Sequence, residues 1–234
     1  LRALCHSGRA KILRRSLMSL ILALAGLILL VALGAWQLQR MLAKDALLAA
    51  IDTHIAAEPV NLPANPDPLH DQYLSVRVKG DLSEPHIRVL VSRKQIGPGY
   101  RIISPLQIGA RRIMVDRGFL PIEQKEKSLV YKDVTVFGNL LWPDETDSFT
   151  PENDLANNIW FARDVDKMAA YLGTEPVLVV ARETSFNDMP VAPFPVNTAG
   201  IPNDHLQYAL TWFLLAAVWA AMAGTLLWRD RTKT

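Results

Sequence analysis

Two long apolar runs stand near the two ends of the chain. Residues 16–39 and 206–228 contain no formally charged side chain. A helix needs about 20 apolar residues to cross a hydrocarbon core about 30 Å thick, and both runs meet that length. We therefore predict transmembrane helices over 16–39 and 206–228, joined as a hairpin anchor. The alternatives are a buried helix of a soluble protein and, for the first run, a cleaved signal peptide.

The chain between these runs changes its hydrophobic period. Residues 40–57 keep apolar side chains at helical spacing, which predicts that the first helix continues beyond the apolar run. Two proline-rich segments follow, at 58–71 and 181–202. Proline fixes φ and removes a backbone donor, so both segments are predicted to be extended connectors.

Between the connectors, apolar and polar residues alternate in short stretches rich in Val and Ile. Such stretches, bounded by Gly or Pro, predict strands. They lie at 73–79, 87–92, 101–108, 112–116, 134–140 and 177–182. One helix is predicted after Asp164, a suitable N-cap, and before Gly173. The expected fold class is therefore membrane α + β, in which a two-helix hairpin anchor flanks an antiparallel, barrel- or sandwich-like β-rich domain with one packed helix.

Composition and charge refine this arrangement. The mean hydropathy is +0.13, and 21% of the residues are charged, which excludes a chain made only of membrane helices. Residues 1–15 carry five basic side chains and no acid, whereas 40–205 carry 17 basic and 22 acidic ones. Basic flanks stay on the cytoplasmic side of a membrane. We therefore expect cytoplasmic tails at 1–15 and 229–234 and a periplasmic domain at 40–205 in a bacterial inner membrane, or the mitochondrial inner-membrane equivalent.

The search for catalytic and nucleic-acid-binding patterns is negative. The sequence has no GxSxG, HExxH, P-loop or GxGxxG pattern. The net charge of +2, without a basic stripe, argues against nucleic acid as a partner. A single cysteine, Cys5, and scattered methionines argue against copper delivery by this chain alone. We expect no enzyme.

Amphipathic side chains cluster where each apolar run meets the middle of the chain. His205, Tyr208 and Trp212 share one helical face at the start of the second run. A neutral imidazole there suits an axial ligand of haem iron. Trp36, Gln37 and Arg40 form a matching cluster at the end of the first run, where Arg40 could meet a haem propionate. The alternative is that these residues are only an aromatic belt and a snorkelling arginine at the membrane surface.

Four motifs together resemble one known family. Residues 34–40, GAWQLQR, resemble the GxWQxxR signature of the Surfeit locus protein 1 family. Residues 97–106 resemble its GxxGY…(T/S)PL block, and 115–121, VDRGFLP, resemble its V-N-R-G-W-(V/L)-P block. Residues 203–213, NDHLQYALTWF, resemble its N-N-H-L-x-Y-A-x-T-W-F block, and the four blocks occur in the family's order. The departures are Asp116 for Asn, Phe119 for Trp and Asp204 for Asn.

The resemblance implies a role in assembling haem-copper terminal oxidases such as cytochrome c oxidase. The implied partners are the catalytic subunit of the oxidase, haem A synthase and the lipid bilayer. Some bacterial members are thought to bind haem A, which implies His205 as the iron ligand and a macrocycle held between the two spans. The further residues expected at this cofactor site are Tyr208, Trp212, Trp36, Arg40 and Arg117. Two readings compete with this one: a scaffold that never binds haem, and an anchored sensor or hydrolase, which the missing catalytic motifs disfavour.

Overall fold

The computed structural model describes residues 2–94, 96–124, 130–199 and 201–232, with side-chain surroundings given from residue 17 to residue 229. Apart from Arg229, the basic side chains of the predicted tails at 1–15 and 229–234 lie outside this description. The chain divides into two compact units. We call Leu1–Ala49 with Ala199–Thr234 the helical unit and Ala50–Thr198 the β-rich unit.

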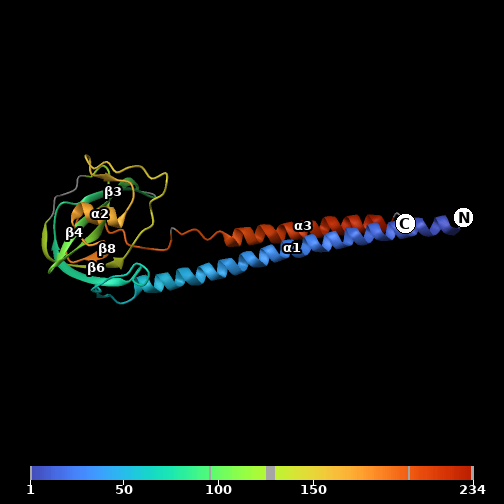
Figure 1. Cartoon of the computed structure of the whole chain (residues 1–234), viewed down its shortest axis with the longest axis horizontal. Coiled ribbons are helices and arrows are strands. Elements are labelled where there is room, and N and C mark those ends of the chain that lie inside the picture. The colour runs from blue at the N-terminus through green and yellow to red at the C-terminus, as the bar shows by residue number, and fades with distance from the viewer. Residues whose placement is uncertain (1, 95, 125–129, 200, 233–234) are drawn as a thin grey trace. The chain divides into compact units, whose positions relative to one another are not determined.

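Two long helices make up most of the helical unit, and they run side by side (Figure 1). Helix α1 spans Arg2–Ala56, with its last turns in the β-rich unit, and helix α3 spans His205–Thr232. Within them, Leu17–Ala56 and His205–Arg229 are long and apolar enough to cross a membrane, with mean hydropathies of 2.7 and 1.8 in their most apolar windows. Only 6% of either window is buried, which argues against core helices of a soluble protein. The predicted continuation of the first helix beyond residue 39 is confirmed.

The strands of the β-rich unit match the alternating stretches of the sequence. The strands are β1 (Val60–Asn61), β2 (Ser75–Leu82), β3 (Ile87–Arg93), β4 (Gly97–Ile108), β5 (Arg111–Pro121), β6 (Tyr131–Leu140), β7 (Ile159–Trp160) and β8 (Leu178–Thr184). All six predicted strands are confirmed, while the two-residue strands β1 and β7 were not predicted. A two-residue strand has too few positions to display an alternating pattern.

The sheet is mixed, so the expectation of a purely antiparallel sheet is wrong. Its order is β1-β2-β6-β8-β5-β4-β3-β7, and β2 also pairs with β4. This extra pairing spans two residue pairs and partly closes the sheet without making a regular barrel. Strand β8 lies between β5 and β6, parallel to β5 and antiparallel to β6, and it follows the segment that contains β7 and helix α2 (Val165–Leu172).

Helix α2 has the ends that the sequence predicts. Asp164 is the N-cap and its side chain accepts a hydrogen bond from the Lys167 backbone N–H. Gly173 ends the helix in the left-handed conformation, where glycine carries no Cβ penalty. The predicted apolar face is buried, and it consists of Val165, Met168, Ala169 and Leu172.

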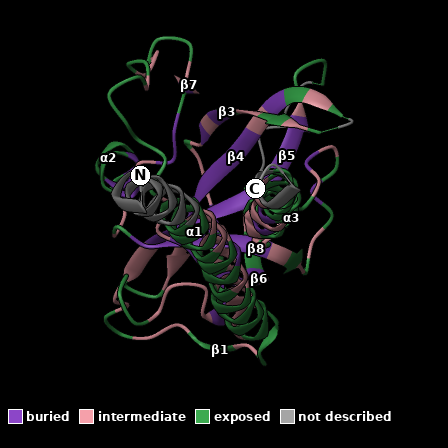
Figure 2. Ribbon diagram, turned by 90° about the vertical axis from the view of Figure 1, so that its right-hand side faces the viewer, coloured by how far each residue is buried: buried purple, intermediate pink, exposed green. Residues whose placement is uncertain are grey.

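Besides a smaller cluster of Ile102, Leu120 and Val191, two apolar cores lie on opposite faces of the sheet. One fills the partly closed side, with buried residues from β2, β4, β5, β6 and β8. The other lies between the sheet and α2, where Met168 packs with Ile103 and Leu178. Figure 2 shows this burial along the strands, whereas α1 and α3 are mostly exposed. At 0.8 kcal/mol per buried CH₂, these cores are the main source of stability for the β-rich unit.

The end of α1 is capped inside the β-rich unit. The carbonyl oxygen of Ile55 accepts hydrogen bonds from Asn139 Nδ2 at 3.0 Å and from Arg182 Nη1 at 3.2 Å. Carbonyls in the last turn of a helix have no partner within the helix, and a cation there also complements the helix dipole. These two side chains therefore fix where the helix stops.

Candidate functional site

The two helices of the helical unit pack closely at glycine residues. Gly26 lies against the ring of Trp219, and Gly34 lies against the ring of Phe213. A Cβ atom on either glycine would come within 2.7 Å of ring atoms. The buried α3 residues in this seam are Ala209 and Ala216. Small residues let membrane helices approach closely, so this seam is suited to a lipid environment.

Polar side chains join the same two helices near the start of α3. Lys44 Nζ donates to the Pro202 carbonyl oxygen at 2.6 Å, and Asn203 Nδ2 donates to Asp45 Oδ1 at 2.7 Å. His205 Nδ1 lies 2.8 Å from Gln37 Oε1. We call this group the polar end of the helix pair, and it consists of Gln37, Lys44, Asp45, Pro202, Asn203 and His205. It brings together two motifs that lie at opposite ends of the chain.

Five of the predicted haem-site residues belong to the helical unit, and they differ in exposure. His205 is the first residue of α3 and is half-buried, as is Trp212. Trp36 and Tyr208 are 51% and 57% exposed, and Arg40 is also exposed. The structure therefore holds the imidazole in the helix seam and leaves two aromatic rings and a guanidinium open. Their roles toward haem remain predictions.

The chemistry of His205 fits an iron ligand. Nδ1 of His205 contacts the Gln37 amide oxygen, so Nε2 is the ring nitrogen without this contact and is the one open to an iron atom. The Phe213 ring fills the seam beside Gly34. The macrocycle expected between the spans stays a prediction. A cavity of about 350 Å³ does separate the helices near Trp219, but Trp219 lies about 21 Å from His205 along α3.

Arg117, the sixth predicted site residue, belongs to the β-rich unit and is 2% exposed. Its Nε donates to Asp188 Oδ2 at 2.8 Å, and its Nη2 donates to the other carboxylate oxygen. Its Nη1 donates to Ser104 Oγ at 3.2 Å. A bidentate arginine–carboxylate pair is strong and directional. Arg117 therefore holds Asp188, within the 181–202 connector, and we leave it out of the proposed haem site.

Neighbouring residues of the same motif hold the rest of this connector. Phe119 and Ala192 exchange backbone hydrogen bonds of 2.7 and 2.9 Å. Gly118 has φ +132°, and a Cβ atom on it would lie 2.1 Å from the Ala192 carbonyl oxygen. The Arg101 guanidinium lies 3.9 Å from the centre of the Phe194 ring and donates to the Phe194 carbonyl oxygen at 3.1 Å. We call this set of contacts the connector clamp; its residues are Arg101, Arg117, Gly118, Phe119, Asp188, Ala192 and Phe194.

A buried charge network adjoins the clamp. Asp116 Oδ2 accepts a hydrogen bond from Arg101 Nη1 at 2.7 Å and lies 3.5 Å from Arg163 Nη1. Arg163 also binds Glu145, with Nη2 and Oε1 2.5 Å apart. The two cations, Arg101 and Arg163, thus balance the two anions of the network. Asp116 itself has no solvent exposure. Asp116, one of the departures from the family pattern, has two arginine partners that an Asn amide would not neutralise.

Acid is expected to weaken the β-rich unit through Glu145. Burial raises the pKa of this carboxyl, but the hydrogen bond and charge of Arg163 outweigh it, so the pKa lies below the ordinary 4.5. A lowered folded-state pKa stabilises the fold above the ordinary value, and this contribution is lost as pH falls through the folded value. The free energy of unfolding should therefore fall more steeply from about pH 5 to about pH 3 in the wild type than in Glu145→Gln.

Denaturant unfolding of the full chain at a series of pH values measures this difference. Glu152→Gln, which changes an exposed carboxylate in the same loop, is the control. A wild-type minus Glu145→Gln difference that stays constant across the range would contradict the prediction.

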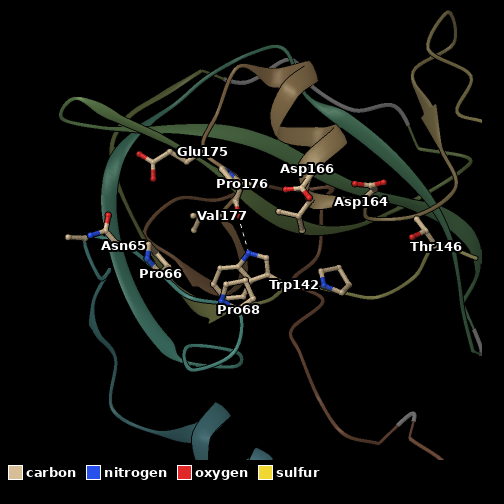
Figure 3. Close-up of a pocket in the computed structure, with 13 residues that line it drawn as sticks. Asn65, Pro66, Pro68, Trp142, Thr146, Asp164, Asp166, Glu175, Pro176 and Val177 are labelled. Atoms are coloured by element: carbon tan, nitrogen blue, oxygen red, sulfur yellow. Dashed lines mark hydrogen bonds between the residues drawn. The ribbon is translucent and has the colours of Figure 1, made fainter.

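A groove of about 640 Å³ lies on the β-rich unit around Trp142 (Figure 3). Trp142 Nε1 donates to the Pro176 carbonyl oxygen at 3.0 Å, which fixes the indole in the groove wall. The remaining proline residues in the lining are Pro66, Pro68 and Pro143. Two of the acidic residues at its edge already have partners, because Asp164 caps α2 and Glu175 binds Arg111 at 2.7 Å. The groove therefore carries little uncompensated charge.

The sequence places Gln37 in the cluster with Trp36 and Arg40 but predicts no partner for it, and it assigns neither Asn203 nor Asp188 to a site. Asn203 stands in the same motif as His205, and that neighbourhood is the available signal. Asp188 lies in a proline-rich connector, where an acidic residue is ordinarily solvated, so nothing in the sequence distinguishes it. Among the described residues, no group of three or more His, Cys, Asp or Glu side chains could hold a metal ion.

Comparison with known proteins agrees with the motifs. The model of the SURF1 family matches residues 24–217. Surfeit locus protein 1 of Homo sapiens is 32% identical over 210 residues, which cover 79% of this chain and 69% of the human protein. The SURF1-like protein of Rickettsia prowazekii is 30% identical over 211 residues, covering 83% of this chain and 84% of the relative. Because the family match covers the whole sheet and parts of both helices of the seam, the chain belongs to the SURF1 family.

Proposed function

We propose that this protein is a non-catalytic assembly factor for a haem-copper terminal oxidase, cytochrome c oxidase, and that it binds haem A as cargo for the catalytic subunit. The proposal of oxidase assembly rests on membership of the SURF1 family over residues 24–217. The haem component rests on one observation, the half-buried imidazole of His205 with Nδ1 engaged and Nε2 available. Haem A synthase is the proposed donor.

The proposed setting is a bacterial inner membrane, with both helices spanning it. Basic residues at 1–15 and 229–234 favour cytoplasmic ends, and the β-rich unit is then periplasmic. The mitochondrial inner membrane is the equivalent setting, with the β-rich unit in the intermembrane space. In either case, the polar end of the helix pair lies at the outer membrane surface, the side on which the β-rich unit would meet the oxidase subunit.

Each residue of the helical unit has a proposed task toward haem A. His205 donates its Nε2 lone pair to the iron. Trp36, Tyr208 and Trp212 provide aromatic surface for the macrocycle, and Arg40 meets a propionate through a charge-assisted hydrogen bond. A single protein ligand orients the cargo and still permits its release to the oxidase.

The test is the spectrum of the full chain purified from cells that make haem A, together with the oxidase content of those cells. We expect haem in the wild type, and a loss of at least tenfold in haem and in assembled oxidase for His205→Ala. His70→Ala, at a histidine that is 81% exposed in the β-rich unit, is the matched control and should retain both.

A scaffold that stabilises an oxidase intermediate without haem is the second candidate function. The groove around Trp142 favours it, because a fixed indole among prolines is a surface suited to protein contact. Wild-type protein free of haem, with full oxidase assembly in His205→Ala, would support the scaffold and remove the haem component.

A further inference from the structure

The hydrogen bond between Gln37 and His205 determines which ring nitrogen of the imidazole is engaged within the protein. Gln37 Oε1 lies 2.8 Å from Nδ1 of His205, across 168 residues of sequence. An amide oxygen has lone pairs and no hydrogen, so the imidazole must donate. When one ring nitrogen of a neutral imidazole carries the hydrogen, the other carries the in-plane lone pair. The contact therefore selects Nε2 as the basic atom of His205.

The packing of the helices holds the amide where it can make this selection. Gln37 is half-buried on α1, three residues after the contact of Gly34 with the Phe213 ring. About two turns beyond Gln37, the Lys44 and Asp45 contacts tie α1 to the residues that precede His205. Contacts on both sides of Gln37 thus fix its position along the helix axis, and its rotation about that axis, relative to the imidazole.

We propose that Gln37 is a positioning residue, which holds His205 in the Nδ1–H tautomer and directs Nε2 toward an incoming Lewis acid. Carbonyl acceptors on the second nitrogen of a metal-binding histidine orient the ring and raise its basicity. The identity of the Lewis acid as haem iron rests on the proposed function. The pairing of Nδ1 with Gln37 does not, because it is a contact within the protein itself.

A purely structural role for Gln37 makes a different prediction. If the bond served only to join the helices, the two neighbouring contacts at the polar end would carry the same task. Removing the acceptor would then change helix pairing without a specific change at the imidazole. The protonation of Nδ1 and Nε2 of His205 distinguishes the positioning role of Gln37 from a purely structural one.

The first measurement is the ¹⁵N spectrum of histidine-labelled full-length protein in lipid nanodiscs, with the His205 signals assigned from a His205→Ala spectrum. We expect a protonated Nδ1 and an unprotonated Nε2 in the wild type. Gln37→Leu should shift the population toward the Nε2–H form, and Gln37→Glu, which keeps an acceptor oxygen, should preserve the wild-type tautomer. Gln39→Leu, at an exposed glutamine on the same helix, is the matched control. An Nε2–H tautomer in the wild type, or an unchanged tautomer in Gln37→Leu, would overturn the inference, and the wild-type spectrum decides even where a variant fails to fold.

The second measurement is a haemin titration of the same samples, followed by absorbance. We expect Gln37→Leu to weaken haemin binding about 10- to 100-fold, the usual effect of losing such a partner, with Gln37→Glu and Gln39→Leu close to wild type. If the tautomer depends on Gln37 but the wild type takes up no haemin, the haem function fails and the positioning role stands. If haemin binds equally to all variants and the tautomer ignores Gln37, the positioning role fails and the haem function stands.

Discussion

Replacing Gly118 by alanine should lower the thermal midpoint of the β-rich unit by about 10 °C or more. The residue has φ +132°, a conformation that costs an L-amino acid about 1–3 kcal/mol. The new Cβ would also lie 2.1 Å from the Ala192 carbonyl oxygen, and relieving such overpacking costs about 1–3 kcal/mol. Each kcal/mol corresponds to about 2–4 °C in a domain of this size.

The loss should have a local origin that a matched variant can isolate. Gly97 also has a positive φ, +105°, but nothing lies within 4 Å of the position of its Cβ. Gly97→Ala therefore measures backbone strain alone and should cost less than half as much as Gly118→Ala. In limited proteolysis of Gly118→Ala, the 181–202 connector should be cleaved before the rest of the β-rich unit. Equal midpoints for the two variants would show that the contact with Ala192 contributes nothing.

Arg117→Met should destabilise the β-rich unit by about 3–5 kcal/mol, because it leaves the Asp188 carboxylate buried without its partner. The free energy of unfolding from denaturant titration of the full chain measures this loss. Arg117→Met combined with Asp188→Leu should recover much of it, since an apolar pair can replace a buried ion pair at little cost. Lys79→Met, which breaks an exposed pair with Asp133, should cost about 0–1 kcal/mol.

The same variant tests where Arg117 acts. The connector clamp predicts that the effect of Arg117→Met is on stability. A variant with wild-type stability that had lost only haem binding would contradict this assignment and return Arg117 to the haem site.

The strands and helices were predictable because local patterns specify them. The alternation of Val76 and Val78 with Arg77 and Lys79 appears in β2 as buried and exposed positions. The capping residues of α2 also act within a few positions of the helix they bound. The parallel pairing of β5 with β8 was not predictable, because it depends on the path of a long crossover and leaves no periodic signal.

The candidate site was predictable in its residue types and not in its contacts. His205 and Trp36 attract attention because amphipathic side chains end two apolar runs. The pairing of His205 with Gln37 depends on how two helices 168 positions apart align, which neither run specifies alone. Arg117 shows the reverse difficulty. A charged residue in a strand is ordinarily read as exposed, and only the tertiary fold reveals that Asp188 neutralises it.

The contacts of Gly26 with Trp219 and of Gly34 with Phe213 also oppose sliding of α3 along α1. Sliding α3 along α1 by one residue, about 1.5 Å, would drive the Phe213 ring toward the side chain of Leu33 or Ala35 and lift it out of the notch at Gly34. The Trp219 ring at Gly26 resists the same displacement two turns away. The axial register set at Gly26 and Gly34 therefore also sets the position of His205 along α1, so a methyl group introduced at either glycine is expected to shift His205 relative to Gln37.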